Sequence, residues 1–400
     1  MPIDTPRLRH AEPLRWNPAL EGLRCLACGR LEPVRLWHSG CSACAARGVH
    51  VSLAASYIEG AKAGVSLPFF GAGSLGEGAT PCRDLPALAR ALGVARLQVK
   101  DESRNPTGSH KDRMSAFGTA HAQLAGVRTV VLASSGNAAV SAAAYAAAAG
   151  LACEVATYDG MPLPYVRELE RLGAVRHSFP DNDARWRFVA ERARSDDVLA
   201  LTNHQLPALG SAPLAIEGYK LLAQEIAEAG ELPHHVVVPT SRGDLVWGIW
   251  RGLRELLAGG RITEMPRLWV SEPIARLSRV LQGEPLHGSY PGVSAQFSTG
   301  GHTVTWLQHE AATGSEGGAV FVPDDQARRA RWDLREHGLS PELCAAGTLA
   351  AAWQLVRSGR IQRDERVLLV LTAASTRDPS WPDPGLPASL FDQPTTGVAA

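Results

Sequence analysis

The chain has 400 residues, 45% of them hydrophobic, so it is long enough for about two or three domains with substantial cores. Its 40 basic and 40 acidic side chains cancel, and this balance makes nucleic acid or an anionic membrane an unexpected partner. No stretch reaches the roughly 18 unbroken apolar residues of a membrane span, and residues 1–16 lack the apolar centre of a signal peptide. We therefore expect a cytoplasmic, multi-domain protein.

Four of the seven cysteines form two CxxC pairs near the N-terminus, Cys25 with Cys28 and Cys41 with Cys44. An odd cysteine total without a secretion signal argues against disulfides, whereas two CxxC pairs provide the four thiolates of a tetrahedral zinc site. Because four thiolates leave no open position for a substrate, we expect the zinc to be structural. Two alternatives are a reduced arm without metal and a redox pair, and the lack of a βαβ pattern around either CxxC disfavours the redox pair.

Beyond this segment, short apolar β-rich runs alternate with helical patterns. Several runs are continuously apolar, as is typical of parallel strands that are covered on both faces. The alternating order of strands and helices predicts an open α/β sheet. The expected strands are residues 95–100, 128–134, 152–158, 235–240, 267–272 and 366–372, and the helical patterns include 213–230 and 347–360.

Three junctions that follow expected strands carry small and hydroxyl residues. They are "SSGN" from Ser134, "SRGDL" from Ser241, and a strand that ends in Thr372. Ligands of open α/β sheets bind beyond the carboxyl ends of strands, where backbone N–H groups at helix starts can hold an anion. Each turn taken alone is equally compatible with ordinary helix capping. Together with Lys111 in the turn "NPTGSHKDR", they indicate a ligand site.

Four segments give the chain a family resemblance: "LGEGATP" (75–81), "KDESRNPTGSHKDRM" (100–114), "ASSGNAAVSAAAYAAAAG" (133–150) and "IEGYKLLAQEI" (216–226). In this order they resemble threonine synthase and its relatives in the tryptophan-synthase-β-like, fold type II family of pyridoxal-phosphate (PLP) enzymes. The similarity extends from about residue 70 to residue 378. It implies an α/β fold with two open sheet domains and an N-terminal zinc-ribbon-like extension, which many threonine synthases also have.

The resemblance also implies a division of the chain and an assembly. The large PLP-binding domain would contain residues 56–104 and 202–378, and the small α/β domain would contain residues 105–201. Residues 1–55 would form the extension with its four-cysteine ribbon, and the Pro-rich residues 379–400 a flexible tail. Relatives are commonly dimers, so a homodimer is expected.

By the same resemblance, individual residues acquire roles. Lys111 matches the lysine that forms the Schiff base with PLP, Asn137 matches the asparagine beside the cofactor's phenolic oxygen, and Thr372 falls where a hydroxyl meets the pyridine nitrogen. A Schiff-base lysine must become neutral, so its pKa has to fall below about 10.4. A hydroxyl would not hold the pyridine nitrogen protonated, which favours elimination or replacement over transamination. The phosphate loop would be Ser241, Arg242, Gly243, Asp244 and Leu245, and the substrate carboxylate would meet Thr107, Ser134, Ser135 and Gly136.

Three departures from the family pattern concern the ligands. The phosphate loop reads "SRGDL" where the family is rich in Gly and Asn, so Asp244 would repel a phosphate unless its side chain turns away or pairs with Arg242. His110 replaces a phenylalanine, and we interpret it as a further ligand of the cofactor phosphate, with a packing role as the alternative. The lysine that the family has near Tyr165 is missing, which removes one contact to a substrate phosphate.

We therefore expect PLP-dependent elimination or replacement at the β or γ carbon of an amino acid. Threonine synthase activity, which converts O-phosphohomoserine and water to threonine and phosphate, is the leading hypothesis. The alternative is a related β-replacement or dehydration that acts on phosphoserine, serine, threonine or another amino acid, including in specialised metabolism. A non-catalytic scaffold is a third hypothesis, which the retention of Lys111, Asn137 and Thr372 disfavours.

Overall fold

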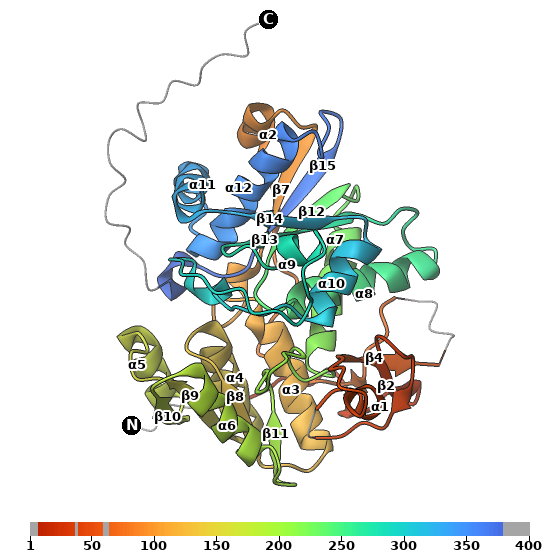
Figure 1. Cartoon of the computed structure of the whole chain (residues 1–400), viewed down its shortest axis with the longest axis vertical. Helices are drawn as coiled ribbons and strands as arrows, with labels where there is room; N and C mark the ends of the chain where they lie inside the picture. Colours follow the sequence, from red (N-terminus) through yellow and green to blue (C-terminus); the bar gives the residue numbers. More distant parts are fainter. Residues whose placement is uncertain (1–6, 37–38, 59–63, 379–400) are drawn as a thin grey trace, which may run out of the picture.

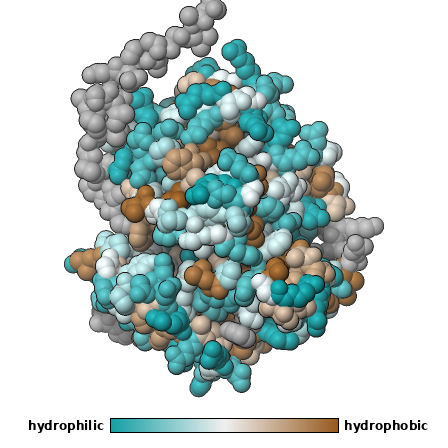
Figure 2. All heavy atoms as spheres, viewed as in Figure 1, coloured by the Kyte–Doolittle hydropathy of each residue, from teal (hydrophilic) through white to brown (hydrophobic). Residues whose placement is uncertain are grey.

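The computed structural model describes residues 7–36, 39–58 and 64–378, so the tail predicted at 379–400 lies outside the described residues. One mixed sheet and one parallel sheet form two α/β layers, and a small antiparallel sheet lies beside them (Figure 1). Most of the face shown in Figure 2 is hydrophilic, and hydrophobic residues appear there in separate small areas. None of the helices described is both long and apolar enough to cross a lipid bilayer.

The larger sheet has six strands in the order β14-β13-β12-β15-β7-β6. Neighbouring strands are parallel except for β6 and β7, which are antiparallel. This sheet occupies the upper half of Figure 1. Its strands are β6 (Cys82–Asp84), β7 (Arg96–Asp101), β12 (His235–Pro239), β13 (Arg267–Glu272), β14 (Gly318–Phe321) and β15 (Arg366–Leu371).

Helices cover both faces of this sheet, which explains the continuous apolar character of its strands. In β12, Val236 and Val238 belong to the core on one face, whereas Val237 belongs to the core on the other. The first core includes η2 (Ile216–Tyr219), α7 (Lys220–Glu228), α8 (Asp244–Ala258), α9 (Leu277–Val280) and α10 (Trp306–Gly314). The second core includes α2 (Pro86–Leu92), α11 (Asp324–Glu336) and α12 (Leu343–Arg357).

The smaller sheet has four parallel strands in the order β10-β9-β8-β11, in the lower left of Figure 1. The alanine-rich helix α4 (Asn137–Ala149) packs on it with a buried face of small side chains, so helix and sheet can approach closely. The strands are β8 (Thr129–Ala133), β9 (Ala152–Tyr158), β10 (Val175–Phe179) and β11 (Val198–Ala200). The helices are α3 (Lys111–Leu124), α4 (Asn137–Ala149) and α5 (Leu163–Arg171) on one face and α6 (Asn182–Arg192) on the other.

All six strands expected from the sequence are present, each within one residue of the expected ends. The helical pattern at 213–230 corresponds to η2 followed by α7, and the pattern at 347–360 lies largely within α12, which begins earlier, at Leu343. Four strands of the two α/β sheets were not expected, namely β6, β10, β11 and β14. They have only three to five residues each, and β10 ("VRHSF") lies at a sheet edge with polar side chains.

The N-terminal segment forms an antiparallel sheet in the order β3-β2-β4. The short helix α1 (Ser42–Ala45) lies between β3 and β4 in the chain. Its strands are β2 (Leu20–Cys25), β3 (Leu31–Glu32) and β4 (Leu53–Tyr57), and nearby β1 (Arg15–Trp16) pairs with β5 (Phe69–Phe70). This extension shares a hydrophobic core with Phe117 of α3 and Tyr145 of α4. It is therefore packed against the α/β body rather than separate from it.

Candidate functional site

A cavity of about 410 Å³ lies between the two α/β sheets. Residues at or just beyond the carboxyl ends of β8, β9, β12 and β15 line it, which is the position of ligand sites in open α/β sheets. The predicted cofactor and substrate residues that line it are His110, Lys111, Ser134, Ser135, Gly136, Asn137, Ser241, Arg242, Gly243, Asp244, Leu245 and Thr372.

Thr107 is the predicted substrate residue that does not line this cavity. Its N–H and its hydroxyl both donate to Asp112, at 2.7 and 2.5 Å, and Ser141 donates to the same carboxylate at 2.7 Å. Burial raises the pKa of Asp112 to about 6, although these hydrogen bonds oppose the rise. Asp112 is thus held by hydroxyl and backbone donors and forms no ion pair with its neighbour Lys111.

Lys111 begins α3 and lines the cavity because the residues before it are attached to the end of β15. The N–H of His110 donates to the carbonyl of Thr372 at 2.9 Å, and Ser109 forms an antiparallel bridge with Ala373. These contacts bring the first turn of α3 beside Thr372, which is far away in the sequence. The predicted lysine and the predicted hydroxyl therefore meet at one wall of the cavity.

The environment of Lys111 favours its neutral amine. Burial lowers the pKa of Lys111 below its ordinary value, whereas the negative charges of Asp244 and Glu342 act to raise the pKa and only partly offset the effect of burial. The Nζ atom lies 3.5 Å from the hydroxyl oxygen of Tyr219. A neutral amine is the nucleophilic form that attacks a carbonyl carbon.

Lys111 also differs from the other lysines, of which the chain has only three. Lys100 and Lys220 are buried, and each lies within 2.9 Å of a glutamate carboxylate. Lys62 lies outside the described residues. Among the lysines that the structure describes, Lys111 alone forms no ion pair, so its amine is available to a ligand.

The loop from Ser241 to Leu245 joins β12 to α8 and lines the cavity at the helix N-terminus. Gly243 has a φ of 96°, and a Cβ atom there would lie 2.5 Å from the Cβ of Gln308, so no larger residue fits. Asp244 accepts hydrogen bonds from the N–H and the hydroxyl of Ser211, at 3.1 and 2.6 Å. Its side chain is therefore held by Ser211, and no ion pair forms between Asp244 and Arg242.

Two arginines, Arg185 and Arg242, line the cavity without an ion pair to any residue that the structure describes. Arg185 is 8% exposed, donates to the hydroxyl of Ser135 at 3.1 Å, and has its guanidinium 4.1 Å from the ring centre of Tyr158. Burial lowers the pKa of Arg185 to about 10, so it remains a cation at neutral pH. The guanidinium of Arg242 lies 5.2 Å from the ring centre of Trp186. A buried cation without a counter-charge, as Arg185 is, and the half-buried Arg242 beside it suit an anionic ligand.

His110 is buried, and its Nδ1 lies 3.2 Å from the carbonyl oxygen of Thr372. Burial and the charge of Lys111 lower the pKa of His110 well below its ordinary value, so the ring is neutral. When Nδ1 donates to the carbonyl, Nε2 carries no proton and can only accept. The contacts present support a role for His110 in positioning Thr372, and the predicted contact to the cofactor phosphate stays a prediction.

Glu342 immediately precedes α12 and lines the cavity, and sequence reasoning missed it. It is 2% exposed and accepts hydrogen bonds from Asn137 Nδ2 (3.1 Å), Ser298 Oγ (2.8 Å) and Thr372 Oγ1 (2.9 Å). The carboxylate thus connects two predicted cofactor contacts, Asn137 and Thr372. One sequence signal could have indicated it: a single acidic residue stands directly before a helix that is almost entirely apolar and buried.

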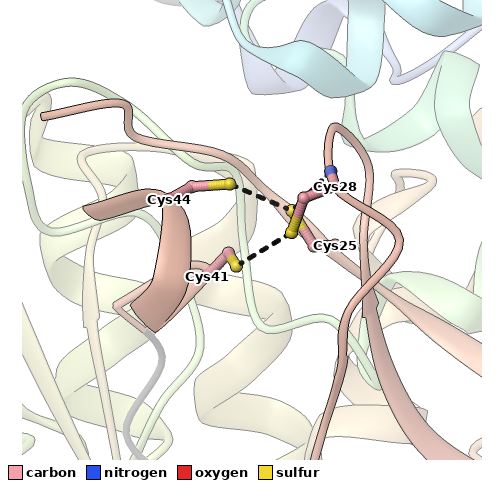
Figure 3. Close-up of side chains that lie close together, drawn as sticks. All are labelled: Cys25, Cys28, Cys41 and Cys44. Carbon is pink, nitrogen blue, oxygen red and sulfur yellow. Dashed lines mark hydrogen bonds between the residues drawn. The ribbon is translucent and has the colours of Figure 1, made fainter. Parts of the chain in front are cut away.

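The four N-terminal cysteines meet in a second candidate site (Figure 3). Their Sγ atoms all lie within 4.8 Å of one another, and Cys25–Cys44 and Cys28–Cys41 are 3.7 Å apart. A tetrahedron with zinc–sulfur bonds of about 2.3 Å has edges of about 3.8 Å. The backbone N–H of Cys28 donates to Cys25 Sγ at 3.4 Å, which stabilises a thiolate. The donor set and its spacing therefore fit a zinc ion.

Comparisons with known proteins identify the family of the chain. Residues 73–373 match the family model described as pyridoxal-phosphate dependent enzyme. The threonine synthase of Methanocaldococcus jannaschii is 31% identical over 322 residues, which cover 76% of this chain and 76% of that protein. The threonine synthase of Mycobacterium leprae is 29% identical over 328 residues, covering 81% of this chain and 88% of that protein.

Two solved structures resemble the chain in fold. The processed form of threonine deaminase isoform 2 from Solanum lycopersicum superposes with a TM-score of 0.63 at 18% identity, covering 74% of this chain and 79% of that one. Maize serine racemase superposes with a TM-score of 0.64 at 16% identity, covering 74% and 88%. At these identities the likeness concerns the fold alone.

Proposed function

The chain belongs to the pyridoxal-phosphate-dependent enzymes and has their type II fold, and we propose that it catalyses elimination or replacement at the β or γ carbon of an amino acid. The leading reaction is that of threonine synthase, in which O-phosphohomoserine and water give threonine and phosphate. The observation that carries this proposal is the position of Lys111, an unpaired lysine of lowered pKa in the cavity where the two sheets meet.

The residues around the cavity fit PLP. The cavity volume lies within the range of about 300–1,000 Å³ that is usual for small-molecule sites. The N-terminus of α8 and the guanidinium of Arg242 suit the cofactor phosphate, and the Nε of Arg242 has no hydrogen-bond partner among the described residues. Asn137 and Thr372 would contact the ring, and the Oδ1 of Asn137 is likewise buried without a described partner.

Bound PLP supplies the electron-withdrawing group that makes bonds at the substrate Cα breakable. The protein's own contribution is positioning and proton transfer. We assign to the amine of Lys111 the removal of the proton from Cα and its return to the product. The segment from Ser134 to Gly136, before α4, would hold the substrate carboxylate with its N–H groups and hydroxyls.

Two features of the chain concern the charge of the substrate, namely Arg185 and the lysine missing near Tyr165. Arg185 offers a buried positive charge beside Ser135, which supports a substrate with an anionic group such as a phosphate in addition to its carboxylate. The second candidate is dehydration or β-replacement on an unphosphorylated or differently activated amino acid. It is favoured by the absence of lysine from residues 159–167, where the family has one near Tyr165.

Covalent trapping tests the proposal directly. The purified protein is loaded with PLP, reduced with borohydride and mapped by peptide mass, and we expect the label on Lys111. Lys100 and Lys220 serve as internal controls because both are engaged in buried ion pairs. A label on another residue, or none, would overturn the proposal. Phosphorylated, acetylated and free hydroxy amino acids, scored for released phosphate and spectral change, would then separate the two candidate reactions.

Three further assignments accompany this function. We infer a structural zinc ion at Cys25, Cys28, Cys41 and Cys44, supported by the sulfur spacing. A homodimer is inferred from the family resemblance. The domain division is supported by the sheets, because β8 to β11 lie within residues 105–201, whereas β6, β7 and β12 to β15 lie in the ranges 56–104 and 202–378.

A further inference from the structure

We propose that Thr157 is a positioning residue, which directs the hydroxyl of Ser135 into the cavity as a hydrogen-bond donor for the carboxylate of the substrate. The inference rests on the proposed function, because it requires an amino acid whose carboxylate lies at residues 134–136. Thr157 itself does not line the cavity, so it acts on the substrate only through Ser135.

Ser135 and Thr157 belong to neighbouring segments of the smaller sheet. Ser135 is the second residue after β8, and Thr157 is the penultimate residue of β9, which pairs with β8 in parallel. The N–H of Ser134 donates to the carbonyl of Ala156 at 3.0 Å, which extends the contact between the two segments beyond the end of β8. The adjacency of these strands (Figure 1) thus brings the hydroxyls of Ser135 and Thr157 to 2.9 Å.

The hydroxyl oxygen of Ser135 accepts two hydrogen bonds. Arg185, on α6, donates from Nη1 at 3.1 Å, and the direction follows because a guanidinium can only donate. Thr157 donates from Oγ1 at 2.9 Å. A hydroxyl has two lone pairs and one hydrogen. Both lone pairs of Ser135 are therefore engaged, and its hydrogen needs an acceptor elsewhere.

The burial of Thr157 explains why its hydroxyl is the donor of this pair. Thr157 is fully buried, and Ser135 is the only hydrogen-bond partner of its hydroxyl in the described part of the chain. If Ser135 donated instead, the hydrogen of Thr157 would remain buried without an acceptor, which is unfavourable. Ser135 lines the cavity, so a bound ligand can accept its hydrogen.

The two donors also make the Ser135 hydroxyl suited to an anion. A hydroxyl that accepts hydrogen bonds is polarised and donates more strongly, and a cationic donor such as Arg185 adds to this effect. Every candidate substrate has a carboxylate, whether or not it is phosphorylated. The role of Thr157 therefore applies to both candidate reactions.

The test is a titration of the full-length, PLP-loaded protein with L-alanine and with L-alaninamide, followed by visible absorbance. Alanine has no leaving group at its β carbon, so the titration measures binding rather than turnover. Alaninamide has the same amine and side chain but no carboxylate. Thr157→Val removes the hydroxyl and keeps the shape of the side chain. It should weaken alanine binding about tenfold, the lower end of the effect of losing a hydrogen bond to a charged group, and leave alaninamide binding unchanged.

Two further variants test whether the hydroxyl of Thr157 is the cause. Thr157→Ser restores the hydroxyl and should recover most of the affinity for alanine. Thr119→Val is the matched control, because Thr119 is also fully buried but donates to backbone carbonyls of its own helix, at 3.0 and 3.1 Å. It should bind alanine like the wild type. Equal weakening of alanine and alaninamide binding in Thr157→Val would overturn the proposal, since general damage to the site would then explain the loss.

A double-mutant cycle tests whether Thr157 acts through Ser135. Ser135→Ala should weaken alanine binding at least as much as Thr157→Val does, and adding Thr157→Val to it should have no further effect. Additive losses in the double variant would overturn the proposal. Ser135→Ala also decides the question if Thr157→Val does not fold. Wild-type affinity for alanine in Ser135→Ala would exclude the donor role of this hydroxyl.

The outcomes separate this inference from the proposed function. Each variant is first checked for PLP on Lys111 by visible absorbance and borohydride trapping. If Thr157→Val holds PLP on Lys111 and binds alanine as tightly as the wild type, only the role of Thr157 is overturned. Failure of the wild type to attach PLP at Lys111 would overturn both.

Discussion

The hydroxyl of Ser52, in the cysteine-bearing extension, donates a 2.8 Å hydrogen bond to the carbonyl of Leu209 in the α/β body. Two residues after Leu209, Ser211 holds the carboxylate of Asp244. A continuous series of contacts therefore runs from the cysteine cluster, through residues 209–211, to the loop proposed to bind the cofactor phosphate. These contacts connect the proposed metal site to the proposed phosphate loop, and we expect the two sites to be coupled.

From this coupling we predict that Cys25→Ser loses zinc and also binds PLP more weakly. Removal of one of four thiolates destabilises a structural zinc site and the small sheet around it, and with it the attachment of residues 209–211. Metal analysis and PLP titration provide the two measurements. Cys82→Ser, which lies on β6 outside the cluster, should keep its zinc. Full zinc content in Cys25→Ser would contradict the assignment of this ligand.

Ser211→Ala should weaken PLP binding by about tenfold, which corresponds to about 1.4 kcal/mol. The variant removes the hydroxyl donor of Ser211 and leaves only its N–H to hold the carboxylate of Asp244. The carboxylate can then turn toward the cofactor phosphate and repel it. The double variant Ser211→Ala with Asp244→Asn should recover most of the affinity, because the repelling charge is gone. Equal affinities of the single and the double variant would show that repulsion by Asp244 is not the cause.

Arg185→Leu should lower kcat/KM for a phosphorylated substrate by about 10- to 100-fold, as expected for loss of a hydrogen bond to a charged group. The effect on an unphosphorylated hydroxy amino acid should be smaller. Arg185→Lys keeps the charge and should fall between the wild type and the leucine variant. Unchanged PLP absorbance in both variants would show that the cofactor site is intact. Equal losses for both substrate types would exclude recognition of a substrate phosphate by Arg185.

Glu225 provides a prediction about pH. Burial alone would raise its pKa, but hydrogen bonds and charges from Arg113 and Lys100 lower the pKa of Glu225 to about 2, from an ordinary value of 4.5. At about 1.4 kcal/mol per pH unit, this difference corresponds to about 3 kcal/mol of stability. The contribution is fully present above pH 4.5 and is lost as the pH falls toward 2. The difference in thermal midpoint between the wild type and Glu225→Gln should therefore be larger at pH 7 than at pH 3.

The sequence predicted those parts of the site that lie within short motifs. Lys111, Asn137 and the loop at Ser241 all stand at strand-to-helix junctions, where the residue pattern itself indicates the position. Strands buried on both faces were equally visible, because their residues form short, continuous apolar runs, as in β12. These features depend on local sequence alone.

Other parts of the site depend on contacts between distant segments and could not be predicted. Glu342 meets Thr372 only because α12 begins beside the end of β15. Arg185 resembles the other arginines of α6, and only the packing of that helix brings it to Ser135. The sequence showed that Asp244 would repel a phosphate in the loop. It did not show that Ser211 holds the Asp244 carboxylate by a hydrogen bond.

The last strand of the larger sheet, β15, lies between β7 and β12, although it follows both by more than a hundred residues. During synthesis on the ribosome, β7 and β12 therefore have no neighbour on that side until residue 371 has emerged, and their hydrogen-bonding edges stay open. Thr372 emerges later still. The nascent chain consequently cannot complete the cavity before β15 has been synthesised, and loss of β15 would divide the sheet in two.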